Sequence, residues 1–147
     1  SRSRKRIAGA AFFAGADELP AFLSGCDILV CLLPLTQYTR GKLNASVFAA
    51  LPAGAVVINV SRGGNLTQDD LIAALDGGHL SAAILDVCEP EPLPGDSPLW
   101  RHPKILLTPH IATKTQAETA ADIVIANLER HRRGEPMEHL VDRQRGY

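Results

Sequence analysis

Apolar residues along the chain collect in four short runs, separated by stretches rich in glycine, proline and polar residues. The runs are Asp27–Pro34, Ala55–Val60, Leu80–Val87 and Lys104–Pro109. The first two are continuous apolar segments that are too short for a comfortable helix. Such segments are typical of strands buried on both faces of a parallel sheet, so we expect the runs to form strands of one sheet.

Segments with helical character lie between these runs. Asp17–Ser24 predicts a short helix that ends at Gly25. Asn44 is the expected N-cap of a second helix, which ends before Pro52. Each helix therefore precedes a strand, as the crossovers of a parallel sheet require.

Two further helices follow the second and fourth runs. Thr67 and Asp70 predict a capping box at the start of a helix that ends at Gly77. The last helix is expected over residues 114–133, before a polar tail. Its apolar stripe consists of Ala121, Ile125 and Leu128.

Strands and helices thus alternate in steps of about 25 residues, which is the pattern of βαβ units. The sequence predicts an α/β fold with a parallel sheet and helices on its faces. The chain has 147 residues, of which 46% are hydrophobic and 21% charged. These values are ordinary for a globular domain with a sizeable core.

Charge, hydropathy and cysteine usage exclude several classes of function. The formal net charge of −1 gives no basic field for nucleic acid. No apolar run reaches the ~20 residues that span a bilayer, and no signal-peptide pattern follows the basic start. Cys26, Cys31 and Cys88 form no pair or cluster with metal-ligand spacing. We therefore expect no membrane partner, no metal and a reducing, cytoplasmic compartment.

Residues of catalytic type follow three of the predicted strands. Arg62 follows the second strand, and His110 follows the fourth. Asp86 lies at the end of the third strand, and Glu89 and Glu91 come directly after it. Ligands of open parallel sheets bind beyond the carboxyl ends of the strands. We therefore expect these side chains to meet at one edge of the sheet.

A cation, a carboxylate and an imidazole at one edge predict acid–base chemistry on a small anion. An arginine fork suits a substrate carboxylate, and a carboxylate beside an imidazole stabilises its protonated form. Each residue also has a plain structural interpretation: Arg62 as a surface cation, the glutamates as solvated loop acids, and His110 as a capping residue. The combination favours proton transfer to a carbonyl or hydroxy compound.

The segment from residue 56 to residue 112 resembles the signature region of the D-isomer-specific 2-hydroxyacid dehydrogenases. N-x-x-R-G, L-x-x-A-L-x-x-G, L-D-V, E-P-L, P-L-W and T-P-H occur in that order and at compatible spacing. The P-L-W segment and the C-terminal tail look most like the glyoxylate/hydroxypyruvate reductase branch. The resemblance implies that residues 1–113 are the second half of a Rossmann-type doubly wound domain, without its glycine loop. Residues 114–147 would be the helix and tail that return to the substrate domain.

The resemblance also implies roles for individual residues. Arg62 would hold the substrate carboxylate, and His110 would protonate the carbonyl oxygen while Glu91, rather than Glu89, keeps the imidazole protonated. Asp86 matches a position that accepts a hydrogen bond from the nicotinamide amide. The implied cofactor-binding residues are Arg2, Ser3, Arg4, Leu33, Pro34, Thr39, Val60, Ser61, Asp86, His110 and Ala112.

The basic start of the chain bears on the choice of cofactor. Members specific for NAD carry an acid at the place where this chain has Arg2, Ser3 and Arg4. Guanidinium and hydroxyl groups suit a 2′-phosphate, so NADP(H) is favoured and NAD(H) is possible. The alternative is a solvated charge run at a frayed terminus.

The implied activity is the NADPH-dependent reduction of glyoxylate, hydroxypyruvate or a similar 2-oxo acid, and we expect the 147 residues alone to be inactive and to form a homodimer. Two alternatives stay open: a non-catalytic assembly module that dimerises through an exposed sheet edge, and a dinucleotide-sensing corepressor. A formate-type dehydrogenase is disfavoured, because those enzymes commonly carry glutamine where this chain has Glu91.

Overall fold

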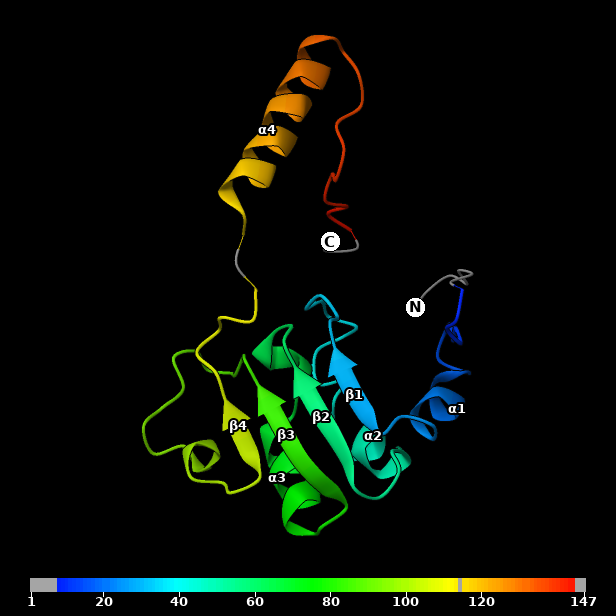
Figure 1. The fold of residues 1–147 in the computed structure, drawn as a ribbon, viewed down its shortest axis with the longest axis vertical. Coiled ribbons are helices and arrows are strands. Elements are labelled where there is room, and N and C mark those ends of the chain that lie inside the picture. Colours follow the sequence, from blue (N-terminus) through cyan, green and yellow to red (C-terminus); the bar gives the residue numbers. More distant parts are fainter. Residues whose placement is uncertain (1–7, 114, 145–147) are drawn as a thin grey trace.

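Parallel strands form an open sheet that follows the order of the chain (Figure 1). The computed structural model describes residues 8–113 and 115–144, and in them the sheet runs β1-β2-β3-β4. The pairing is parallel throughout, with Leu29 opposite Val57 and Val57 opposite Ala83. Each strand lies within its predicted run, so the α/β prediction is confirmed. The strands are β1 (Ile28–Cys31), β2 (Ala55–Asn59), β3 (Leu80–Leu85) and β4 (Ile105–Leu107).

Helices connect the strands and pack mainly on one side of the sheet. Figure 1 shows α2 and α3 against the sheet and α4 standing apart from it. The helices are α1 (Leu19–Leu23), α2 (Ala45–Ala50), α3 (Gln68–Asp76) and α4 (Ala117–Arg132), with 3-10 turns η1 (Gly63–Asn65) and η2 (Pro98–Trp100).

Of the two predicted helix caps, the one at the start of α2 is present and the one at the start of α3 is not. The Asn44 side chain accepts hydrogen bonds from two amides in the first turn of α2, at 3.1 and 3.3 Å, so this N-cap is confirmed. The capping box at α3 is wrong, because the Thr67 side chain makes no capping hydrogen bond. Asp70 Oδ2 instead accepts from the backbone amide of Ala45 at 3.0 Å, which ties α3 to the start of α2.

The core lies between the sheet and these helices. Leu29 and Cys31 of β1 face it, and so does Val57 of β2. Alternate strand residues point to opposite faces, so β1 and β2 each contribute every second side chain. The largest fully buried apolar side chains are Phe48, Leu71, Leu75, Leu80, Leu85, Leu99, Val57 and Val87.

The opposite face of the sheet is open in the described part of the chain. Val30, Ile58, Ile84 and Leu106 pair across the strands in one apolar row. Val30 is 48% exposed and Leu106 58%. The prediction that β1 is buried on both faces is therefore wrong. Both faces are apolar, but the described residues pack helices against only one of them.

Helix α4 begins later than predicted, with Gln116 as its N-cap, and it buries no residue. Ile125 and Leu128 of the predicted apolar stripe are more than half exposed. The chain then turns back along the helix, where Asn127 exchanges two hydrogen bonds with the backbone of Glu138, at 2.8 and 3.2 Å. None of the helices in the described ranges is long and apolar enough to cross a membrane.

The core predicts the effect of a truncation in α3. Leu71 is 0% exposed, so Leu71→Ala removes buried apolar contacts and leaves a cavity. We expect the free energy of unfolding to fall by about 2–5 kcal/mol in urea denaturation followed by circular dichroism. Leu128→Ala on the exposed face of α4 is the matched control, with an expected change of about 0.5 kcal/mol or less. Equal losses in the two variants would contradict this description of the core.

Candidate functional site

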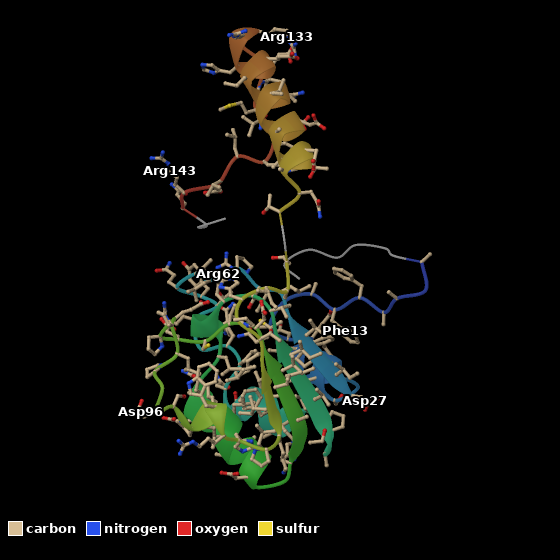
Figure 2. All side chains as sticks on the ribbon, turned by 60° about the vertical axis from the view of Figure 1, so that its left-hand side comes forward. Phe13, Asp27, Arg62, Asp96, Arg133 and Arg143 are labelled. Carbon is tan, nitrogen blue, oxygen red and sulfur yellow. The ribbon has the colours of Figure 1, made fainter. Side chains whose placement is uncertain are left out.

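The loops that follow β1, β2, β3 and β4 meet at the carboxyl edge of the sheet, because all strands run in the same direction. Figure 2 shows Arg62 among these loops, on the side of the sheet from which α4 emerges. Asp27, at the start of β1, lies toward the opposite edge. This edge is where ligands of open α/β sheets bind.

A hollow of about 410 Å³ opens between the ends of β1 and β2. Its size falls within the range of ~300–1,000 Å³ that is typical of ligand sites. The structure brings together here Arg62 and four predicted cofactor-binding residues from two separate loops. The lining residues are Leu32, Leu33, Pro34, Leu35, Val60, Ser61 and Arg62.

A buried amide network holds the two loops of this hollow together. Asn65 Nδ2 donates to the carbonyl of Leu33 at 2.7 Å and contacts Ser61 Oγ at 3.0 Å. Ser61 Oγ donates to Asn59 Oδ1 at 2.7 Å, and Asn59 Nδ2 donates to the carbonyl of Arg62 at 3.1 Å. Asn59 and Asn65 are both 0% exposed. The network therefore fixes the backbone on both sides of the hollow.

Thr39 does not line the hollow, but it contacts the loop after β1 that does. Its Oγ1 donates to the carbonyl of Pro34 at 2.6 Å and accepts from the amide of Thr36 at 2.8 Å. These hydrogen bonds hold the loop after β1 in a compact turn. Thr39 is predicted to bind the cofactor. In this structure its side chain stabilises the loop around Pro34.

His110 and Glu91 lie side by side at the ends of β4 and β3. His110 Nδ1 is 2.8 Å from Glu91 Oε1, and both side chains are 44% exposed. A carboxylate only accepts, so this contact places the hydrogen on Nδ1 and leaves Nε2 for a ligand. Glu89 lies elsewhere, because Arg40 Nη1 holds its two carboxylate oxygens at 2.8 and 2.9 Å. Of the two candidate acids, Glu91 is therefore the one beside the imidazole.

The buried carboxylate of Asp86 organises the segment that carries His110. It is 3% exposed. Thr108 Oγ1 and the amide of Ile111 donate to its Oδ1 at 2.5 and 2.9 Å, and the amide of Ala112 donates to its Oδ2 at 2.9 Å. Burial by itself would raise the pKa of Asp86, but these hydrogen bonds and the nearby His110 hold it below its usual value.

The backbone at His110 has a left-handed conformation, with φ of 56°. Such angles are unusual outside glycine and need support from the surroundings. The amide of His110 donates to the carbonyls of Asp86 and Thr108, at 2.9 and 3.0 Å. Asp86 thus holds the imidazole in place through the backbone on both sides of it.

Three of the predicted cofactor-binding residues belong to the N-terminal segment. Arg2, Ser3 and Arg4 lie outside the described residues. Within residues 8–113 and 115–144, no group of three or more His, Cys, Asp or Glu side chains could hold a metal ion. Burial, with Glu91 and Asp86 nearby, raises the pKa of the Cys88 thiol, which does not suit a nucleophile.

Sequence reasoning missed the residues that support the site. Asn59 and Asn65 carry a usable signal, since an amide within or just after an apolar strand must find buried partners. Arg40 and Gln68, which hold the loop after β3, carry none, because their partner Glu89 is distant in sequence.

Titration of Asp86 predicts a specific pH dependence of stability. Its pKa is lowered in the folded chain, so the ionised carboxylate stabilises the fold above the unfolded pKa of about 4. That contribution is lost as the pH falls through the folded-state pKa. We expect Asp86→Asn to show a smaller loss of unfolding free energy between pH 6 and about pH 2 than the wild-type chain. The exposed Asp96→Asn should keep the wild-type slope; a wild-type slope in Asp86→Asn would refute the assignment.

Residues 1–112 match the family model described as D-isomer specific 2-hydroxyacid dehydrogenase, NAD binding domain. Over all 147 residues the chain is 47% identical to the glyoxylate/hydroxypyruvate reductase A of Yersinia enterocolitica and covers 47% of it. For the protein of the same name from Salmonella newport, the identity is 46% and the coverage 47%. The chain thus spans about half the length of the curated relatives it matches.

Solved structures give the same result. A D-isomer specific 2-hydroxyacid dehydrogenase from Xanthobacter autotrophicus, in complex with NADPH and MES, superposes with a TM-score of 0.96 at 48% identity, covering 100% of this chain and 61% of that one. An NADPH-dependent glyoxylate/hydroxypyruvate reductase from Sinorhizobium meliloti, in complex with NADP and sulfate, gives 0.93 at 41% identity, with coverages of 100% and 48%. These matches confirm the Rossmann-type fold. The chain belongs to the D-isomer specific 2-hydroxyacid dehydrogenase family.

Proposed function

We propose that this chain is the later part of a reductase that converts a small 2-oxo acid, such as glyoxylate or hydroxypyruvate, to the 2-hydroxy acid with NADPH. The observation that carries the proposal is the 2.8 Å contact between His110 Nδ1 and Glu91, which leaves Nε2 available to a ligand. The names of the relatives from Yersinia enterocolitica and Sinorhizobium meliloti support the same reaction.

In this proposal each charged side chain has one task. Arg62 binds the substrate carboxylate, for which the guanidinium fork is suited. His110 donates a proton from Nε2 to the carbonyl oxygen of the substrate. Glu91 stabilises the imidazolium before this transfer and fixes the ring through Nδ1. NADPH, when bound, supplies the hydride.

The residues around the hollow fit a dinucleotide. Leu33, Pro34 and Val60 provide an apolar lining, to which Ser61 adds a hydroxyl group. Asp86 Oδ2 accepts one hydrogen bond from the protein, so it has a further acceptor position for a carboxamide near Ala112. We assign the 2′-phosphate of NADPH to Arg2, Ser3 and Arg4, whose residue types suit it. The NADPH and NADP in the two solved relatives support this preference.

We infer that turnover needs more than these 147 residues. The relatives are about twice as long. In this proposal residues 1–113 belong to a nucleotide domain and residues 114–147 to a substrate domain. By itself the chain is expected to be inactive or nearly so. The free thiols of Cys26, Cys31 and Cys88 support a reducing compartment, for which we propose the cytoplasm.

Steady-state kinetics test the proposed reaction. The complete enzyme should reduce glyoxylate and hydroxypyruvate with a higher kcat/KM for NADPH than for NADH, measured by loss of reduced-nicotinamide absorbance. His110→Gln should lower kcat by about 10²–10⁴-fold because the proton donor is lost. Arg62→Gln should lower kcat/KM about a hundredfold, largely through KM.

Matched variants on α4 provide the controls for this experiment. His131→Gln and Arg132→Gln change the same residue types on an exposed helix, and they should leave the kinetics unchanged. Wild-type kcat in His110→Gln would rule out the proposed proton donor. Equal efficiency with NADH would rule out the cofactor preference.

The open face of the sheet favours a second candidate function, an assembly module that forms a homodimer. Val30, Ile58, Ile84 and Leu106 form an apolar row, and β1 has only β2 as a neighbour among the described strands. Exposed edges and apolar patches of this kind promote pairing between copies.

Light scattering tests this association. The 15.7 kDa chain should show about twice that mass at high concentration, and Val30→Lys should shift it to the monomer because a charge cannot be buried unpaired. Ile125→Lys on α4 is the control with an equally exposed apolar residue and should stay dimeric. A monomer at every concentration would exclude the dimer.

A further inference from the structure

The loops after β1, β2 and β3 contact one another near the pair formed by His110 and Glu91. Arg40 lies between β1 and α2, Gly63 and Gly64 open the turn η1 after β2, and Glu89 follows β3. The amide of Gly41 donates to the carbonyl of Gly64 at 2.9 Å. This hydrogen bond joins the loop that carries Arg40 to the turn after Arg62, and the same turn contacts the loop that leads to Glu91.

The two glycines make this contact possible. A Cβ on Gly63 would lie 1.9 Å from the carbonyl oxygen of Cys88, so the two backbones touch. A Cβ on Gly64 would lie 2.5 Å from Glu89 Oε2 and 2.8 Å from Arg40 Nη1. The backbone after β3 and the side chains of Arg40 and Glu89 thus directly contact the turn that follows Arg62.

Two side chains hold Glu89 against the turn that contains Gly63 and Gly64. Arg40 Nη1 donates to Glu89 Oε1 and Oε2 at 2.9 and 2.8 Å, and Gln68 Nε2 donates to the Glu89 carbonyl. The side chains of Arg40 and Glu89 are 57% and 49% exposed. A pair this exposed adds little to stability, so its removal should leave the fold intact.

We propose that Arg40 is a positioning residue that acts through Glu89 to set Glu91 against His110. Glu89 is two residues before Glu91, and Arg62 directly precedes Gly63. The contact between the turn at Gly63 and the loop after β3 therefore also fixes Arg62 relative to His110 and Glu91. This role rests on the proposed reductase function, and small displacements of acid–base groups lower rates strongly.

Kinetics of the complete enzyme provide the first test. Arg40→Gln and Glu89→Gln should each lower kcat about tenfold, with the KM values for the 2-oxo acid and NADPH within about twofold of wild type. The double variant Arg40→Glu/Glu89→Arg restores the pair and should recover most of kcat. The melting temperature should stay within about 2 °C in all of them, because the pair is exposed.

Arg133→Gln is the matched control, since it removes an exposed ion pair with Glu129 and Glu135 on the distant α4 segment. It should behave as wild type. A large rise in the 2-oxo acid KM in Arg40→Gln, with no rescue in the swapped variant, would instead make Arg40 a substrate-binding cation and overturn the proposal. Unchanged kcat in both single variants would overturn it as well.

A spectroscopic readout separates this proposal from the reductase function. The ring ¹H–¹³C correlation of His110, assigned with His110→Gln, should move in Arg40→Gln and in Glu89→Gln, and return in the swapped variant. If the enzyme shows no 2-oxo acid reduction but this resonance follows the pattern, the reductase function fails and the positioning role stands. An unmoved resonance overturns the positioning role whatever the activity.

Discussion

The parallel pairing of neighbouring strands, from β1 through β4, is the constraint on which the rest of the structure depends. Because every strand runs the same way, the loops after them converge on one edge and share a small volume. The ladder continues past the strands: the amide of Asp86 donates to the Asn59 carbonyl, and the amide of Thr108 donates to the Leu85 carbonyl, each at 3.0 Å. The side chains of the site begin where this regular pairing ends.

Polar groups at that edge form hydrogen bonds to one another and to the backbone of the loops. Asp86 uses its carboxylate to hold the backbone around His110, and Asn65 holds the Leu33 carbonyl. Such groups are buried, so losing one partner leaves the other without compensation for its desolvation. Arg62, Glu91 and His110 are instead exposed, with 44% exposure for the side chains of both Glu91 and His110.

The predictions from sequence succeeded where the signal was local and failed where distant segments decide. Apolar runs located every strand, and Asn44 was identified as an N-cap because its partners are the next few amides. The capping box at Thr67 failed because Asp70 bonds to Ala45 in another helix. Nothing near Arg40 in the sequence indicates that it pairs with Glu89, 49 residues away. The charged residues at this edge could be predicted from the sequence. The residues that hold their loops in place could not, because their partners become neighbours only in the folded chain.

Gly63 gives this arrangement a consequence for sequence variation. A Cβ at that position would collide with the Cys88 carbonyl, and every single-nucleotide change that replaces glycine with another amino acid introduces a Cβ. No missense change there can leave the neighbouring loop where it is. Position 63 is thus intolerant of substitution although glycine has no side chain. A substitution at position 63 would therefore disturb the candidate site although every charged side chain remained present.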